Sequence, residues 1–279
     1  MSKLTAQRSN RSAYLRNRNG KHTPENLSVR VAFVPSEIVP LPETVAVLVD
    51  VMRATTAIVH FLDRGVRQVI LTTGVRRALR EAARVPGSLL CGESRDGERL
   101  SGFDLAPSPT LIDRCELQHK TVVLKTSNGT VAASYLRRRG VGRIYIGSLN
   151  QRTAVARAAL RAALKAGAHI SIVCAGRERC RSIALDDAFA AGSIVTALAR
   201  LNPCLQLHDS AILALALVER FAPMDAFRAS GTWRVLSKTD VGTEDLQLCS
   251  KCDISTAVPM LKERDGRLVA VLDSRERGA

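Results

Sequence analysis

Charged and hydroxyl-bearing side chains follow an unbroken apolar run in the segment VAVLVDVMRATT. Asp50 comes directly after the run, and three further polar residues follow it: Arg53, Thr55 and Thr56. A carboxylate at the end of a buried strand is costly unless it is paired or bound to a metal. Arg53 could be that partner, or it could clamp a phosphate. We therefore predict catalytic roles for Asp50 and Arg53, with the two threonines as substrate contacts.

The segment TSNGT has the composition of an anion site at the start of a helix. Ser127, Asn128 and Gly129 lie where an apolar run gives way to a helical pattern. Free N–H groups and the positive end of a helix dipole would face an anion there. The hydroxyls of Thr126 and Thr130 would add donors. The alternative is an ordinary helix cap, since Ser, Thr and Asn all cap helices well.

Several carboxylates lie in or beside the breaks after apolar runs. Mg²⁺ takes oxygen ligands and usually uses one or two carboxylates together with phosphate oxygens and water. Asp50, Glu93 and Asp104 are the predicted ligands. Asp186 and Asp187 open a helical segment, where capping is the alternative. We expect Asp187 to align the attacking water.

A cysteine and a basic loop follow another apolar run, in SIVCAGRERCR. Cys174 is a candidate nucleophile, and the alternative is a small core residue. Arg177 and Arg179 are candidate contacts for an anionic group of the substrate. A solvated basic loop is the alternative for these arginines.

Several familiar chemistries are excluded by spacing. The chain has neither the GxxxxGK[ST] run of a P-loop nor the GxSxG of a serine hydrolase. A haloacid-dehalogenase-type phosphatase requires a second Asp where this chain has Met52, and a cysteine phosphatase loop requires Arg where it has Cys180. Cys249 and Cys252 form a CxxC without a second pair, which disfavours zinc.

Apolar runs alternate with amphipathic helical stretches through most of the chain, which predicts an α/β fold. We expect a layered α/β/α arrangement around a largely parallel or mixed sheet, with ligands at the carboxyl ends of the strands. The last third differs, with two successive helices, a shorter helix from about Gly231, and strands near DLQLCS (245–250) and RLVAVL (267–272). The other predicted strands are 45–51, 67–73, 88–93, 120–126, 143–148 and 169–176.

The chain has 279 residues, 46% of them hydrophobic, which suffices for one large domain or two close lobes. Seven cysteines without a disulfide spacing favour a reduced, cytoplasmic protein. No apolar stretch reaches the roughly 18 residues of a membrane span, so no membrane partner is expected. A homodimer is left open as the oligomeric state.

The first 30 residues carry seven Lys or Arg against one Glu, and the whole chain has a net charge of +15. We predict a disordered basic tail over residues 1–30, followed by one domain over 31–279. A nonspecific contact with nucleic acid, a transit-peptide-like role and a plain solvated extension are the alternatives for the tail.

The motifs, in their order along the chain, resemble the 2-phosphosulfolactate phosphatase family. They are DVMRATTAIV, GES…GFDLAPSP, TSNGT, GSLN, CAG…LDDAFAAG, LHDSA and DLQLCSKCDISTAVP. The resemblance runs from about Val31 to Leu272. It carries the family pattern onto Asp50, Arg53, Thr55, Glu93, Gly102, Asp104, Ser127, Asn128, Gly129, Cys174, Gly176, Asp187, Gly192, Asp209, Asp245, Asp253 and Pro259.

The resemblance implies an α/β, Mg²⁺-dependent acid phosphatase that cleaves 2-phospho-3-sulfolactate, whose product leads toward coenzyme M in some organisms. A small phosphorylated organic acid is the expected ligand. The family's GER is GES here, and an expected His-Gly pair is Thr232-Trp233. The competing hypothesis is a basic nucleic-acid-binding protein on a degenerate phosphatase scaffold. The scarcity of aromatic residues, 4% of the chain, argues against it.

Overall fold

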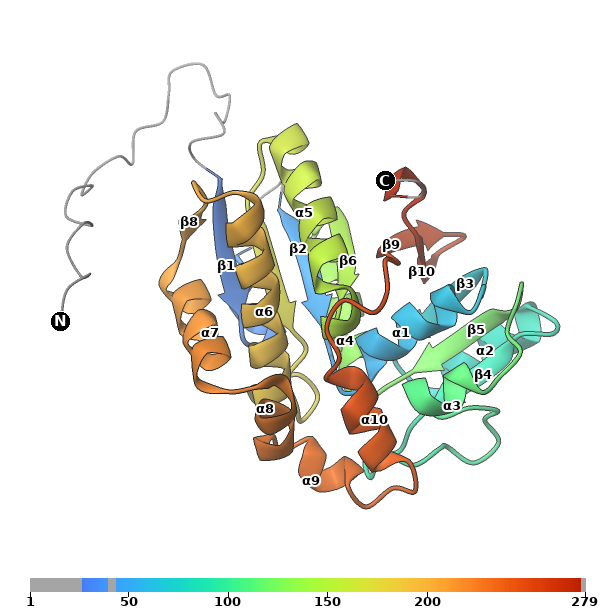
Figure 1. Cartoon of the computed structure of the whole chain (residues 1–279). Helices are drawn as coiled ribbons and strands as arrows, with labels where there is room; N and C mark the ends of the chain where they lie inside the picture. The colour runs from blue at the N-terminus through green and yellow to red at the C-terminus, as the bar shows by residue number, and fades with distance from the viewer. Residues whose placement is uncertain (1–26, 40–43, 277–279) are drawn as a thin grey trace.

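The computed structural model describes residues 27–39 and 44–276. Within these residues one mixed sheet of ten strands runs through the molecule in the order β4-β5-β3-β10-β9-β6-β2-β7-β1-β8 (Figure 1). The strands are β1 Ser28–Ala32, β2 Val45–Val49, β3 Gln68–Thr72, β4 Leu89–Gly92, β5 Thr121–Lys125, β6 Arg143–Gly147, β7 Ile170–Cys174, β8 Gln206–Leu207, β9 Pro259–Arg264 and β10 Arg267–Leu272.

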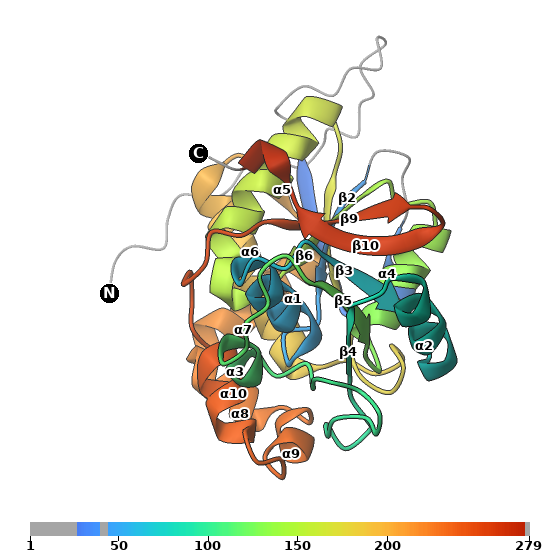
Figure 2. The ribbon, with the colours of Figure 1, turned by 90° about the vertical axis from the view of Figure 1, so that its right-hand side faces the viewer.

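The sheet consists of two parallel groups joined by an antiparallel hairpin. Strands β4, β5 and β3 form one group, and β6, β2, β7, β1 and β8 form the other. The β9–β10 hairpin pairs antiparallel with β6 on one side and β3 on the other (Figure 2). Its turn is Asp265-Gly266, and both residues have left-handed φ values, 51° and 68°, as a two-residue hairpin turn requires.

Helices cover both faces of the sheet. Alternate residues of β2 face opposite layers, because Val47 packs in one hydrophobic cluster with α5 and α6, whereas Leu48 packs in another with α1 and α4. The helices are α1 Ala54–Asp63, α2 Val75–Arg84, α3 Pro109–Asp113, α4 Gly129–Arg138, α5 Arg152–Ala166, α6 Leu185–Leu201, α7 Asp209–Arg220, α8 Pro223–Ala229, α9 Trp233–Leu236 and α10 Gly242–Cys249. The predicted layered α/β architecture is confirmed.

The six strands predicted in the first two thirds of the chain are confirmed as β2 to β7. The predicted strand at 245–250 is wrong, because this segment belongs to α10. Asp245, Leu246 and Cys249 are buried there at helical spacing, a pattern that the short apolar run concealed. Strands β1, β8 and β9 were not predicted.

The predicted disordered tail of residues 1–30 ends too late. Ser28, Val29 and Arg30 belong to β1, where backbone pairing with β7 and β8 fixes them. Residues 1–26 lie outside the described part of the chain. Among the described residues, none of the helices combines the length and the apolar character that a bilayer crossing requires.

Candidate functional site

Asp50 lies where the two strand groups meet. Its carboxylate follows β2 and accepts hydrogen bonds from the backbone N–H groups of Ala54 and Gly129, the first residues of α1 and α4. A Cβ atom on Gly129 would lie 2.7 Å from Asp50 Oδ2, so this close approach requires glycine. The anion at the TSNGT helix start is therefore, in the structure, a side chain of the protein itself.

Arg53 is bound to carboxylates other than Asp50. Its side chain is 1% exposed, with Nη1 donating to Asp245 Oδ2 at 2.8 Å and Nη2 to Glu93 Oε2 at 3.2 Å. Nη2 also donates to the carbonyl oxygen of Gly97. The buried Nε–H has no hydrogen-bond partner in the described part of the chain. Of the two alternatives for Arg53, the pairing with Asp50 is therefore not formed, and the buried Nε–H is left unsatisfied.

Three buried carboxylates, those of Asp50, Asp186 and Asp187, lie close together at the carboxyl ends of the strands, a place that we call the carboxylate corner. Burial, followed by the charges of Glu93 and Asp186, raises the pKa of Asp50 to about 8. Burial also raises the pKa of Asp186 to about 6. For Asp187, burial and the two neighbouring aspartates raise the pKa well above its usual range. Such mutual repulsion is what a bound divalent cation would relieve.

The three predicted metal ligands are not gathered into one group. Across residues 27–39 and 44–276, no three His, Cys, Asp or Glu side chains are arranged to hold a metal ion. Asp104 is exposed and its Oδ2 accepts the N–H of Leu90 at 2.7 Å, because its loop folds back along β4. Asp50 and Glu93 remain electrostatic neighbours. Two carboxylates fit Mg²⁺, which completes its shell with water and phosphate oxygens.

Asp187 joins the ends of two strands. Its Oδ1 accepts the N–H of Val51 at 2.9 Å, and its Oδ2 accepts the N–H of Gly176 at 2.9 Å. These bonds tie the carboxyl end of β2 to that of β7 and leave each oxygen with a backbone partner. The structure therefore gives Asp187 a positioning role, in place of the predicted alignment of water.

The hydroxyl groups of the predicted substrate-binding threonines are used within the fold. Thr55 Oγ1 accepts the N–H of Asp50, and Thr56 Oγ1 donates to the carbonyl oxygen of Val51. Thr126 and Thr130 cap each other, since each hydroxyl oxygen accepts the other residue's N–H. The capping alternative therefore explains Thr130, and the hydroxyls of Thr55 and Thr56 are likewise bonded within the fold and not free as substrate contacts.

Asn128 fixes the basic loop that follows β7. Its Oδ1 accepts the N–H of Arg179 at 3.0 Å, and its carbonyl oxygen accepts the Sγ–H of Cys180. Glu178, Arg179 and Cys180 are consecutive residues with left-handed φ values of 53°, 60° and 69°, a conformation that L-residues rarely repeat. This contact brings the loop beside Ser127, which is half-buried at the same strand end.

The two loop arginines are in different environments. Arg177 is half-buried and packs against Gly231. Its positive charge partly offsets the rise in the pKa of Asp186 that burial causes. Arg179 is exposed, and its positive charge adds to the effect of burial in lowering the pKa of Lys125. Arg177 thus faces the carboxylate corner, whereas the Arg179 side chain lies at its rim.

Three residues of the corner were absent from the predicted site. Asp186 was named among the strand-end carboxylates, with helix capping as the alternative, but was not assigned a site role, and Asp245 was identified only through the family pattern. Lys125, at the end of β5, gave no sequence signal. Its Nζ donates to the carbonyl oxygen of Glu93 at 3.0 Å, and burial lowers its pKa. The lysine places a positive charge beside the carboxylates.

Cys174 lies in the hydrophobic core at the end of β7 and is fully buried. Burial, followed by the charges of Asp187 and Asp186, raises the pKa of its thiol well above the usual range. A thiolate nucleophile requires the opposite environment. This corrects the assignment of Cys174 as catalytic and supports the core alternative.

Replacing Cys174 with alanine is therefore expected to leave the rate of phosphate release within about threefold of wild type, with a modest loss of stability from the small cavity. Steady-state assays beside thermal unfolding separate the two effects. A folded variant with about a hundredfold lower rate would restore the nucleophile hypothesis.

The raised pKa of Asp50 predicts how the stability of the metal-free protein depends on pH. Between its ordinary value of 3.8 and the folded value of about 8, the folded chain binds this proton more tightly than the unfolded chain. The stabilisation that protonated Asp50 gives the folded state is therefore present at low pH, and it is lost as the pH rises through the folded-state pKa of about 8.

We expect the melting temperature to decrease as the pH rises from about 5 to about 8, and to decrease less steeply in the Asp50→Asn variant. Calorimetry of both proteins over this range measures the difference, and parallel curves would contradict it.

Comparisons with known proteins assign the chain to a family. The family model described as 2-phosphosulpholactate phosphatase matches residues 33–264. A protein of Deinococcus radiodurans named probable 2-phosphosulfolactate phosphatase is 33% identical over 86% of this chain and 95% of its own length. A Thermus thermophilus protein of the same name is 33% identical over 86% of this chain and 97% of its own. With a match that spans nearly all of the described residues, the chain belongs to the 2-phosphosulpholactate phosphatase family.

Proposed function

We propose that this protein is a Mg²⁺-dependent phosphoric monoester hydrolase that removes phosphate from 2-phospho-3-sulfolactate or a related phosphorylated 2-hydroxy acid. The observation that carries the proposal is the meeting of Asp50 with Glu93 and Asp186 at the carboxyl ends of strands from both groups. Family membership supports the reaction class. The alternative of nucleic-acid binding on a degenerate scaffold finds no support in these comparisons.

Asp50 and Glu93 would hold the cation. When bound, Mg²⁺ would polarise the phosphorus and offset the charge that builds on the phosphate oxygens. The two backbone N–H groups fix Asp50 in place, so its geometry does not change during the reaction. Because Gly129 and Asp50 cannot separate without breaking this contact, the site depends on the packing of α4 against β2.

Positive charge beside these carboxylates would orient the substrate. Arg53 is held in one orientation by Asp245 and Glu93, which leaves its Nε–H for an anionic oxygen. Lys125, which belongs to the same strand group as Glu93, donates to the carbonyl oxygen of Glu93. Arg177, and Arg179 at the rim, supply the charge that a sulfonate or carboxylate of the substrate would require.

The test of this proposal is a panel of phosphorylated 2-hydroxy acids assayed with and without metal. Activity is expected to disappear after exhaustive chelation with EDTA and to return with Mg²⁺ or Mn²⁺, because the proposed ligands are oxygen atoms. Phosphate release with 2-phospho-3-sulfolactate should exceed that with an aryl phosphate. Full activity in EDTA would refute the metal dependence, and equal kcat/KM across the panel would refute the substrate.

A further inference from the structure

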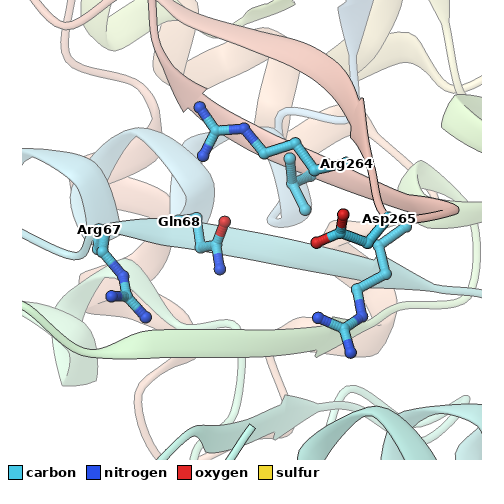
Figure 3. Close-up of a pocket in the computed structure, with 6 residues that line it drawn as sticks. Arg67, Gln68, Arg264 and Asp265 are labelled. Atoms are coloured by element: carbon cyan, nitrogen blue, oxygen red, sulfur yellow. The ribbon is translucent and has the colours of Figure 1, made fainter. Parts of the chain in front are cut away.

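Two adjacent cavities lie between the β9–β10 hairpin and the start of β3, away from the carboxylate corner. Their volumes are about 320 and 440 Å³, and Arg67 and Arg264 border both. Figure 3 shows the labelled side chains of Arg67, Gln68, Arg264 and Asp265 around the smaller one. We call the two cavities together the hairpin groove; its main polar residues are Arg67, Gln68, His119, Lys262, Arg264 and Arg267.

The hairpin groove is separate from the proposed catalytic site. Arg67 contacts the hydroxyl of Thr121, the first residue of β5, whereas Lys125 at the other end of β5 contacts Glu93. Four residue steps of an extended strand span about 13 Å. A ligand in the hairpin groove would therefore approach from the opposite end of this strand.

Positive charge in the hairpin groove is largely uncompensated. Arg264 stands directly opposite Arg267 across the hairpin, and like charges in this position destabilise a sheet. Glu81 pairs with Arg267 at 2.8 Å. Among the described residues, no carboxylate forms an ion pair with Arg67, Lys262 or Arg264. Asp265 is the acidic residue in the lining of the cavities, so the lining as a whole is cationic.

The opposite face of the same hairpin carries a charged residue that does have an ion-pair partner. Glu263 points to the other face of β9 and pairs with Arg137 of α4 at 3.2 Å. Lys262 and Arg264, which flank it, instead face the hollow side, where β10 contributes the apolar residues Val269 and Val271. The cations thus surround an apolar floor, which is the usual composition of a site for a small charged ligand.

We propose that the hairpin groove binds a small anion that carries at least two phosphate groups. Guanidinium groups match phosphate oxygens with paired hydrogen bonds, and Arg67 and Arg264 border both cavities. Exposed charge pairs are individually weak, so a singly charged ion would gain little, whereas a diphosphate can contact both arginines. No Phe, Tyr or Trp side chain is among the residues that line the two cavities, which disfavours a nucleic acid that stacks its bases.

Inorganic pyrophosphate is the probe for this proposal, used with the metal-free full-length protein at low ionic strength. Isothermal titration calorimetry measures the dissociation constant, and amide hydrogen exchange locates the site. The test variant is Arg67→Gln with Arg264→Gln. The matched control is Arg76→Gln with Arg80→Gln, two exposed arginines of α2 that lie outside the groove and give the same change in charge.

We expect the test variant to weaken pyrophosphate binding at least about tenfold and the control to change it less than about threefold. Exchange should slow in residues 259–272, and both variants should keep the wild-type rate of phosphate release.

Equal binding by all three proteins, protection confined to residues 126–138, or no binding to wild type would each overturn the proposal. Tighter binding of a single-stranded oligonucleotide, lost in the test variant, would replace the small anion with a nucleic acid.

Discussion

Replacing Asp50 with asparagine is expected to lower the rate of phosphate release at least about a hundredfold while the protein stays folded. Asparagine keeps the shape and one acceptor oxygen beside the N–H groups of Ala54 and Gly129, but it removes the charge that would hold a cation. Because burial disfavours the ionised carboxylate, the neutral side chain should not reduce stability. Rates at saturating substrate and Mg²⁺, beside a thermal melt, measure both quantities.

Asp104→Asn is the matched control for this prediction, since it removes a carboxylate that the sequence also pointed to. The exposed Asp104 side chain accepts a hydrogen bond from Leu90, so its change should alter the rate less than about threefold. If Asp50→Asn keeps more than about a tenth of the rate, Asp50 is neither an essential ligand nor a nucleophile. If the two variants lose activity equally, the corner centred on Asp50 is the wrong site.

Replacing Asp245 with alanine is expected to destabilise the protein by about 3–5 kcal/mol. The change leaves Arg53 buried, with its charge short of one partner, because both side chains of the pair are at most 1% exposed. Asp245 Oδ1 also accepts the hydroxyl of Ser108 and the N–H of Thr110, and these donors would be orphaned as well. Urea unfolding at constant m-value measures the loss.

The control for Asp245→Ala is Glu263→Gln, which removes one partner of the exposed pair with Arg137. Such a pair contributes about 0–1 kcal/mol, so the midpoint should hardly move. Similar losses in the two variants would mean that burial of Arg53 does not determine the cost. Should the alanine variant fail to fold, Asp245→Asn tests the same charge with less disruption.

Short-range patterns predicted most of the fold because the strands of the parallel groups are continuous apolar runs. β2 and β7 consist entirely of buried residues, which makes their sequences unmistakable. β9 was missed because half of it is charged and exposed, as in KER after PML. The segment of α10 was misassigned because its eight residues bury one face only, and a short apolar run does not distinguish strand from helix.

The corner itself was predictable in part. The expectation that strand ends gather polar groups brought Asp50 and Gly129 into one site, and their contact bears this out. The partners of Arg53 could not be predicted from local patterns, because Asp245 lies 192 residues away in the sequence. Asp245 also belongs to α10, which the sequence pattern had predicted as a strand. The role of the threonine hydroxyls depends on hydrogen-bond geometry, which cannot be predicted from the amino-acid composition of the segment.

The position of the β9–β10 hairpin has a consequence for the order in which the protein is made. Residues 259–272 come after all other strands in the sequence, yet they lie in the middle of the sheet, between β6 and β3. During synthesis, the two parallel groups therefore exist with open edges at β6 and β3 until this hairpin leaves the ribosome. Unpaired edges attract other strands, so a stalled or truncated nascent chain would expose two strand edges that favour aggregation.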